Sequence, residues 1–183
     1  MYAKKLALRM KIYGTMFVAL VLNLMAFPSV FEHLKPNFLV LIVLFWIVSK
    51  PNIVNVGHAF FCGLVLDLSI CTTVGTSDLV SPELASGSTL GIRALAFSLM
   101  AYLIGSTFVK FENYSYLQQS ISVGIVSFIG QIMIFWLEHA FGFAIVDFHF
   151  LLSVLSDAVL WPIVFTGLKA MLRVRQEPTS NDI

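Results

Sequence analysis

Four ionisable residues stand inside long apolar segments of this sequence: Asp67, Arg93, Glu138 and Asp157. A charge at the centre of a bilayer costs about 2.5–3.5 kcal/mol or more, so such residues pair with one another, face water or contact a ligand. Carboxylates in this setting can accept hydrogen bonds or relay a proton, and two that meet can share one proton as a catalytic dyad. The residue types alone leave these chemistries open.

Asp67 and Arg93 form the natural pair. They stand on consecutive apolar segments, each roughly 6 Å from the outer end of its helix at 1.5 Å per residue. We therefore expect an ion pair that replaces two desolvated charges by one neutral unit. It would either lock two helices together or contribute to a ligand site.

Glu138 and Asp157 are then left without a basic partner inside the apolar segments. We expect each of them to carry a proton, to face water or a partner protein, or to lie at the membrane interface. Together with Gln131 and the Asp67–Arg93 pair, they predict a polar cluster in the outer half of the molecule that could contact a partner.

Small and polar residues recur at helical spacing in two segments. The stripe in segment 89–109 consists of Gly91, Ala94, Ser98, Ala101 and Gly105. The stripe in segment 117–143 consists of Ser120, Gly124, Ser127, Gln131 and Glu138. Such stripes let helix backbones approach closely in lipid, so we expect Gly57, Gly63 and the stripes to pack helices, with a substrate tunnel as the alternative.

The composition of the chain indicates that these charged residues lie in a membrane. Apolar residues make up 58% of the 183 residues and charged residues only 11%, where a soluble domain has about 25%. The mean hydropathy is +0.91. Six apolar segments can be delimited, and most reach the roughly 20 residues that cross a bilayer: 12–31, 36–50, 53–71, 89–109, 117–143 and 150–172.

The basic residues favour six spans over five, because such residues collect on the cytoplasmic side of a membrane. With six spans and an inside N-terminus, only Lys35 faces outward and Arg93 lies within a span. The other basic residues face the cytoplasm: Lys4, Lys5, Arg9, Lys11, Lys50, Lys110, Lys169, Arg173 and Arg175. Omitting segment 36–50 would place most of them outside.

The sequence thus predicts an all-α polytopic protein of the bacterial inner membrane, a bundle of six transmembrane helices with both termini cytoplasmic. Residues 1–175 form its single domain and residues 176–183 a polar tail. We expect Pro162 to kink the last helix. A net charge of +1 gives no reason to expect nucleic acid, and Cys62 and Cys71 suggest no disulfide framework or metal site. No motif indicates an enzyme or a cofactor.

Short motifs in a fixed order carry a resemblance to one known family. They are Lys35-Pro36-Asn37, Phe45-Trp46, Pro51 with Val54-Asn55-Val56-Gly57, Gly63 to Leu68 around Asp67, Gly87 to Leu95 around Arg93, Ile134-Phe135-Trp136 with Glu138, and Leu160-Trp161-Pro162. From Lys35 to Arg175 the chain resembles the proteobacterial MreD family. One departure is an insertion of about sixteen residues, around 70–86, in a loop expected to be periplasmic, where insertions are tolerated.

The resemblance implies a non-enzymatic scaffold of the machinery that elongates the lateral peptidoglycan wall. The implied direct partner is MreC, with MreB, RodA and a penicillin-binding transpeptidase in the same assembly and membrane lipid around it. We expect the outer-half stripes to receive the membrane helix or the juxtamembrane segment of MreC, with the polar cluster selecting its register. Two alternatives remain: the substrate-binding membrane subunit of an energy-coupling-factor transporter, which has the same size and helix number, and a small channel or proton-coupled carrier that uses Glu138 and Asp157.

Overall fold

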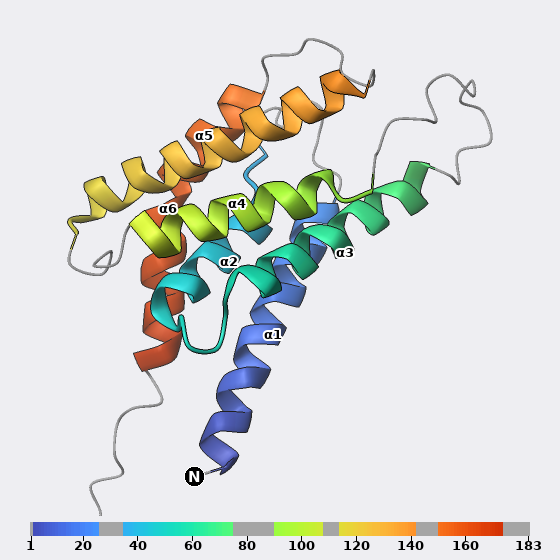
Figure 1. Cartoon of the computed structure of the whole chain (residues 1–183). Coiled ribbons are helices and arrows are strands. Elements are labelled where there is room, and N and C mark those ends of the chain that lie inside the picture. Colours follow the sequence, from blue (N-terminus) through green and yellow to red (C-terminus); the bar gives the residue numbers. More distant parts are fainter. Residues whose placement is uncertain (1, 26–34, 75–89, 108–113, 142–149, 174–183) are drawn as a thin grey trace, which may run out of the picture.

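A computed structural model describes residues 2–25, 35–74, 90–107, 114–141 and 150–173, and these residues are helical with short connecting turns (Figure 1). The helices are α1 (Tyr2–Leu24), α2 (Phe38–Ser49), α3 (Val56–Val74), α4 (Ile92–Thr107), α5 (Tyr116–Ala140) and α6 (Phe150–Arg173). Each apolar segment defined from the sequence overlaps one helix, so the all-α prediction is confirmed for the described residues.

Two boundaries differ from the prediction in an informative way. Helix α1 begins at Tyr2 rather than near residue 12, so Arg9 and Lys11 lie on the helix instead of ahead of it. Helix α3 continues to Val74, so the first residues of the inserted segment lengthen a helix. The rest of that segment and the polar tail 176–183 lie outside the described residues.

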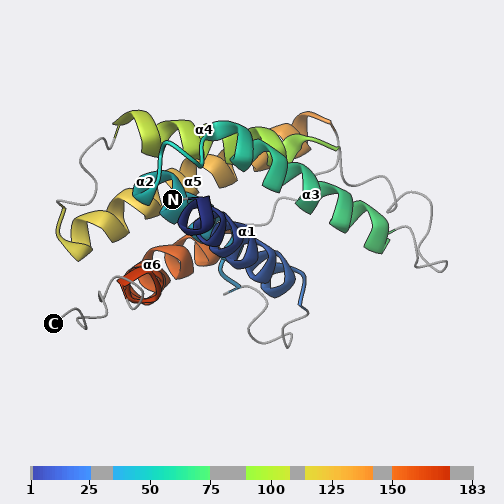
Figure 2. The ribbon, with the colours of Figure 1, turned by 90° about the horizontal axis from the view of Figure 1, so that it is seen from below.

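The helices alternate in direction and α3, α4 and α5 lie side by side in that order. Helix α6 packs against α5, and α1 packs against α2. In Figure 2, α1 points towards the viewer while α3, α4 and α5 run across the view, so α1 crosses them steeply. Lys11 Nζ donates to the Met171 carbonyl oxygen at 3.1 Å, which places the middle of α1 beside the end of α6.

Helix α2 forms the centre of the molecule. It contacts α1, α3, α4 and α6, and eight of its 12 residues are buried: Leu39, Val40, Leu41, Val43, Leu44, Phe45, Trp46 and Ile47. A helix that is apolar on every side must be enclosed by other helices. Its Trp46 indole donates to Thr15 Oγ1 at 2.8 Å, which joins α2 to α1.

Side-chain caps fix where two helices begin. The Asn37 side chain accepts from the Val40 amide at 3.5 Å at the start of α2. Ser115 and Gln118 form a reciprocal capping box at the start of α5. Such caps satisfy amide groups that have no partner within the helix.

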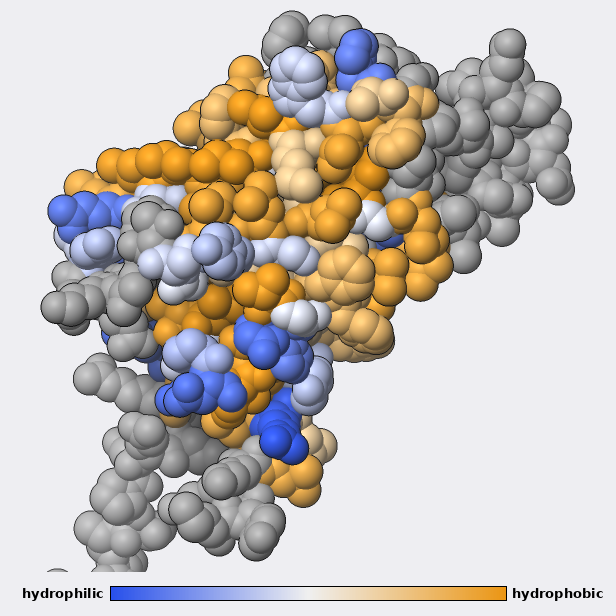
Figure 3. Space-filling model, in the orientation of Figure 1, coloured by the Kyte–Doolittle hydropathy of each residue, from blue (hydrophilic) through white to orange (hydrophobic). Residues whose placement is uncertain are grey.

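The molecular surface is strongly apolar. Phe17, Phe61, Leu117, Trp136 and Ile163 are each more than 60% exposed. Hydrophobic residues cover most of the face in Figure 3, across α3, α4 and α5, and hydrophilic residues gather below them. Apolar exposure on this scale indicates a surface that another apolar phase covers.

Among the described residues, three helices are long and apolar enough to cross a membrane: Leu6–Leu24, Tyr116–Ala140 and Phe150–Leu172. The other apolar helices are shorter, namely Phe38–Ser49, Val56–Ile70 and Ile92–Ser106. At 1.5 Å per residue the 12 residues of α2 extend about 18 Å, against roughly 30 Å of hydrocarbon.

Candidate functional site

The Asp67 side chain on α3 lies wholly buried against the first turn of α4. Its Oδ2 atom accepts hydrogen bonds from the backbone amides of Gly91, at 2.9 Å, and Ala94, at 3.4 Å. The first amides of a helix lack internal partners and carry its positive dipole end, so a carboxylate is well placed there. Asp67 therefore caps a helix that is not its own.

Arg93 joins this carboxylate to a third helix. Its Nη1 atom lies 3.5 Å from Asp67 Oδ1, and its Nη2 atom lies 3.5 Å from Glu138 Oε1 on α5. The arginine and glutamate side chains are 24% and 27% exposed, whereas the Asp67 side chain is 0% exposed. We call Asp67, Arg93 and Glu138 the ion-pair clamp, since together they connect α3, α4 and α5.

The expectation that Glu138 has no basic partner is wrong. Helix α4 lies between α3 and α5, and the guanidinium of Arg93 presents separate nitrogens to the two acids. The sequence predicted only the Asp67–Arg93 pair, because these residues lie on consecutive helices. The planar guanidinium of an arginine carries several N–H groups, however, and can donate to two carboxylates at once. Asp67 and Glu138 thus share a cation, which is an arrangement for holding helices together.

Two glycines make this geometry possible. A Cβ atom on Gly63 would lie 2.6 Å from the Ala94 Cα atom, so the backbones of α3 and α4 touch there, one turn from Asp67. Gly91 has a φ of +106°, a conformation that L side chains rarely adopt. This turn directs its amide towards Asp67.

Asp157 on α6 forms a second polar centre, which we call the carboxylate junction. Its Oδ1 atom accepts from the Asn37 amide at 2.7 Å, and its Oδ2 atom accepts from the Ser127 hydroxyl at 2.6 Å. The residue is 0% exposed. It therefore joins α6 to the start of α2 and to the middle of α5, and its side chain does not face outward to water or to a partner.

Other predicted site residues are placed differently. Gln131 is half-buried and hydrogen-bonds to none of the residues that the structure describes, so it does not join the clamp or the junction. Gly57 is exposed, and a Cβ atom there would meet only the Asn55 side chain, at 3.4 Å. It therefore does not pack two helices together.

Two members of the small-residue stripes, Ala94 and Gly124, pack against the protein's own helices. Ala94 meets Gly63 of α3, and a Cβ atom on Gly124 would lie 3.2 Å from Ala158 Cβ of α6. Ser98 returns its hydroxyl to the Ala94 carbonyl oxygen at 2.8 Å. At Ala94 and Gly124, antiparallel neighbouring helices already occupy the space that a partner's helix would need.

Several buried polar contacts were not singled out from the sequence as site residues. Ser127 and Asn37 complete the carboxylate junction. Gln119 is 2% exposed, and its Oε1 atom accepts from the Trp161 indole at 3.4 Å. The sequence signal for such a contact is a single polar residue at the buried face of an apolar helix. In lipid, its side chain needs a hydrogen-bonding partner from another part of the protein.

The chemistry of these centres is that of structural hydrogen bonding and ion pairing. Each buried carboxylate is engaged by amides, a hydroxyl or a guanidinium. No group of three or more potential metal ligands occurs among the described residues. Breaking such buried contacts is expensive, so they fix the relative position of the helices.

An apolar surface of this extent, helices long enough to cross a bilayer and charges paired between helices define a helical membrane protein. The family model for the rod shape-determining protein MreD matches residues 4–85 and 82–171. The chain is 33% identical over 156 residues to the rod shape-determining protein MreD of Haemophilus influenzae, covering 85% of this chain and 86% of that relative. No solved structure matches the chain significantly.

This chain belongs to the MreD family of rod shape-determining proteins. The resemblance inferred from the motifs around Asp67 and Arg93 is confirmed. The membership supports a role in cell shape, and the comparisons give no support to a transporter subunit.

Proposed function

We propose that this protein is a non-enzymatic membrane scaffold of the machinery that elongates rod-shaped cells, and that it binds MreC directly. The observation that carries the proposal is the family match, which runs through all six helices from residue 4 to residue 171. MreB, RodA and a penicillin-binding transpeptidase are the further members of the proposed assembly. The two buried polar centres suit a scaffold, since each uses its charges to hold helices in place.

The proposed topology is six spans in the bacterial inner membrane with both termini in the cytoplasm. Alternating helix directions support it, as does the contact of Lys11 with the end of α6. Helix α2 is too short to cross alone, but non-helical backbone is tolerated at membrane depth where protein surrounds it. Its partly buried extension at residues 35–37 would complete most of the crossing.

The partner surface that we propose lies at the periplasmic end of α4 and α5. Ala94 and Gly124 of the stripes pack against neighbouring helices, whereas Arg93 and Glu138 remain about one quarter exposed and can be reached from outside. A polar or charged juxtamembrane segment of MreC would find both signs of charge there. Polar contacts of this kind mainly determine which partner binds and in which register, and they contribute less to the binding affinity.

Site-specific photocrosslinking tests this surface in living cells. A photoreactive residue replaces His139, which is exposed and follows Glu138, and the matched control replaces Leu117, which is 77% exposed at the other end of α5. We expect a crosslink to MreC from position 139 and none from position 117. A crosslink from position 117 alone, or from neither position, would contradict the proposed surface.

A further inference from the structure

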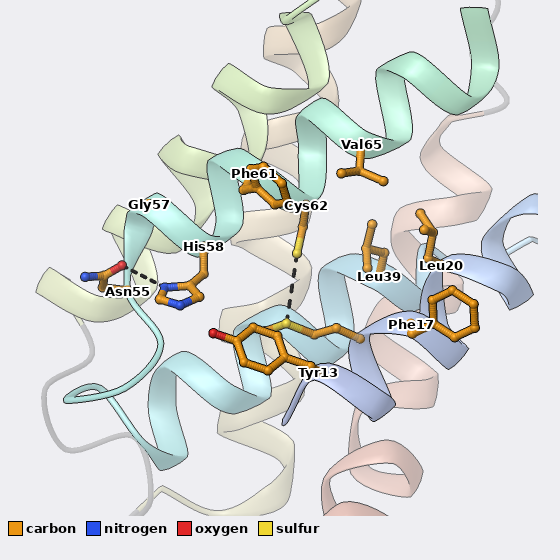
Figure 4. Close-up of a pocket in the computed structure, with 11 residues that line it drawn as sticks. Tyr13, Phe17, Leu20, Leu39, Asn55, Gly57, His58, Phe61, Cys62 and Val65 are labelled. Atoms are coloured by element: carbon orange, nitrogen blue, oxygen red, sulfur yellow. Dashed lines mark hydrogen bonds between the residues drawn. The ribbon is translucent and has the colours of Figure 1, made fainter. Parts of the chain in front are cut away.

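An open apolar groove runs between α1 and α3 (Figure 4). Its volume is about 520 Å³, within the range of roughly 300–1,000 Å³ that is typical of small-molecule sites. Leu39 of the central helix α2 forms part of the lining. Phe17 on α1 and Phe61 on α3 are 66% and 64% exposed, so the groove is open to the surroundings of the protein.

The two ends of the groove differ in polarity. Leu20, Cys62 and Val65 line one part, whereas Tyr13, Asn55 and His58 gather at the other end, as Figure 4 shows. His58 Nδ1 lies 3.0 Å from Asn55 Oδ1, and the rings of Tyr13 and His58 are 6.4 Å apart between centroids. The groove is therefore amphipathic along its length.

The polar end has unused hydrogen-bonding groups. Among the described residues, none bonds to the Tyr13 hydroxyl, to the Asn55 amide nitrogen or to His58 Nε2. Arg9 lies one turn before Tyr13 on the same face of α1, is exposed, and forms no ion pair with a described residue. Several polar groups thus lie where the apolar lining ends, and a cation follows one turn beyond them on α1.

This combination matches a lipid better than a second helix. Along each wall, from Tyr13 to Leu20 and from His58 to Val65, the groove extends about 10 Å at 1.5 Å per residue, about one third of the length that a crossing helix would need. Helix contacts in membranes favour small residues, but Phe17, Leu20 and Phe61 line these walls. An acyl chain is thin enough to lie between such side chains.

We propose that the groove between α1 and α3 binds one acyl chain of an anionic phospholipid, whose phosphate group lies against Tyr13, Asn55 and Arg9. This inference rests on the proposed membrane topology, in which the N-terminal end of α1 meets the cytoplasmic leaflet. A basic residue near a membrane surface attracts anionic lipid, and the neighbouring hydroxyl and amide can donate hydrogen bonds to a phosphate. The site would tie α1, which packs mainly against α2, to α3.

Fluorescence quenching by brominated lipids tests the site in the full chain, reconstituted in vesicles. The reporter is F17W in a W136F background, because Trp46 and Trp161 are buried and Trp136 is exposed. L20W is a second reporter deeper in the groove, and I163W, exposed on α6, reports on ordinary surrounding lipid. The lipids are phosphatidylglycerol and phosphatidylcholine with brominated acyl chains.

We expect the groove reporters to favour brominated phosphatidylglycerol over brominated phosphatidylcholine by about fivefold in effective affinity, the factor for about one cation near an anionic lipid. Position 163 should show no preference. R9Q should abolish the preference, while K11Q should leave it unchanged, because Lys11 lies beside α6 and contacts Met171.

Equal quenching by both lipids at positions 17, 20 and 163 would overturn the proposal. Quenching at position 163 but at neither groove position would also overturn it, since protein would then fill the groove. Support of rod shape by the unmodified chain is scored separately in cells. A lost lipid preference would therefore leave the scaffold role intact, and a failed shape test would leave the lipid site intact.

Discussion

Replacing Asp67 by Asn and by Ala should separate its two structural contributions. One carboxylate oxygen accepts two backbone amides from the start of α4, while the other faces the Arg93 guanidinium. Asparagine keeps an acceptor oxygen for the amides and loses the charge. Alanine loses both, so D67A should cost clearly more stability than D67N.

The magnitudes follow from the geometry. A hydrogen bond to a charged group contributes about 1.5–3 kcal/mol, and loss of a helix cap costs about 1 kcal/mol. Breaking a fully buried ion pair costs about 3–5 kcal/mol, but Arg93 is 24% exposed and keeps Glu138, so this is an upper limit. We expect D67N to cost about 1–2 kcal/mol and D67A about 3 kcal/mol.

The assay is equilibrium unfolding of the purified protein in mixed micelles as the fraction of sodium dodecyl sulfate rises, followed by helix content. E138Q is the matched control, and it should cost no more than about 1 kcal/mol because Glu138 is only partly buried. Equal destabilisation by D67N and D67A would refute the idea that Asp67 caps α4. A charge swap with Arg93 is a poor test, because an arginine at position 67 cannot accept the amides of α4.

Three further outcomes follow from the packing around the two polar centres. G63A should cost about 1–3 kcal/mol in the same assay, since its Cβ would meet the Ala94 backbone, whereas G57A should be nearly neutral. G91A should cost at least about 1 kcal/mol because φ is +106° there, and an equally stable variant would show that this turn can relax. D157A should speed hydrogen exchange at the start of α2 far more than D157N, which keeps one acceptor. Unchanged exchange in D157A would contradict the carboxylate junction.

Helix positions could be predicted from the sequence because apolar segments in a membrane protein carry a strong and simple signal. Polar termini bound each segment, so all six helices fall within or close to the predicted ranges. The length of α1 could not be predicted from hydropathy. Its first turns carry basic residues that are compatible with a helix outside the hydrocarbon, and hydropathy does not detect such turns.

The polar contacts were only partly predictable. Asp67 and Arg93 could be paired because consecutive helices are antiparallel neighbours and their depths agree. Glu138 and Ser127 depend on which helix lies beside which, and on the rotation of each helix about its axis. Their contacts with Arg93 and Asp157 follow from the order α3, α4, α5 and α6, which the spacing along the chain does not specify.

The most direct test of the scaffold role is cell shape after depletion of this protein in its own host, in rich medium that supplies vitamins. We predict that rods widen and become round before growth stops, and that the unmodified chain restores them while D67A does so poorly. Rods of unchanged width after full depletion would contradict the account.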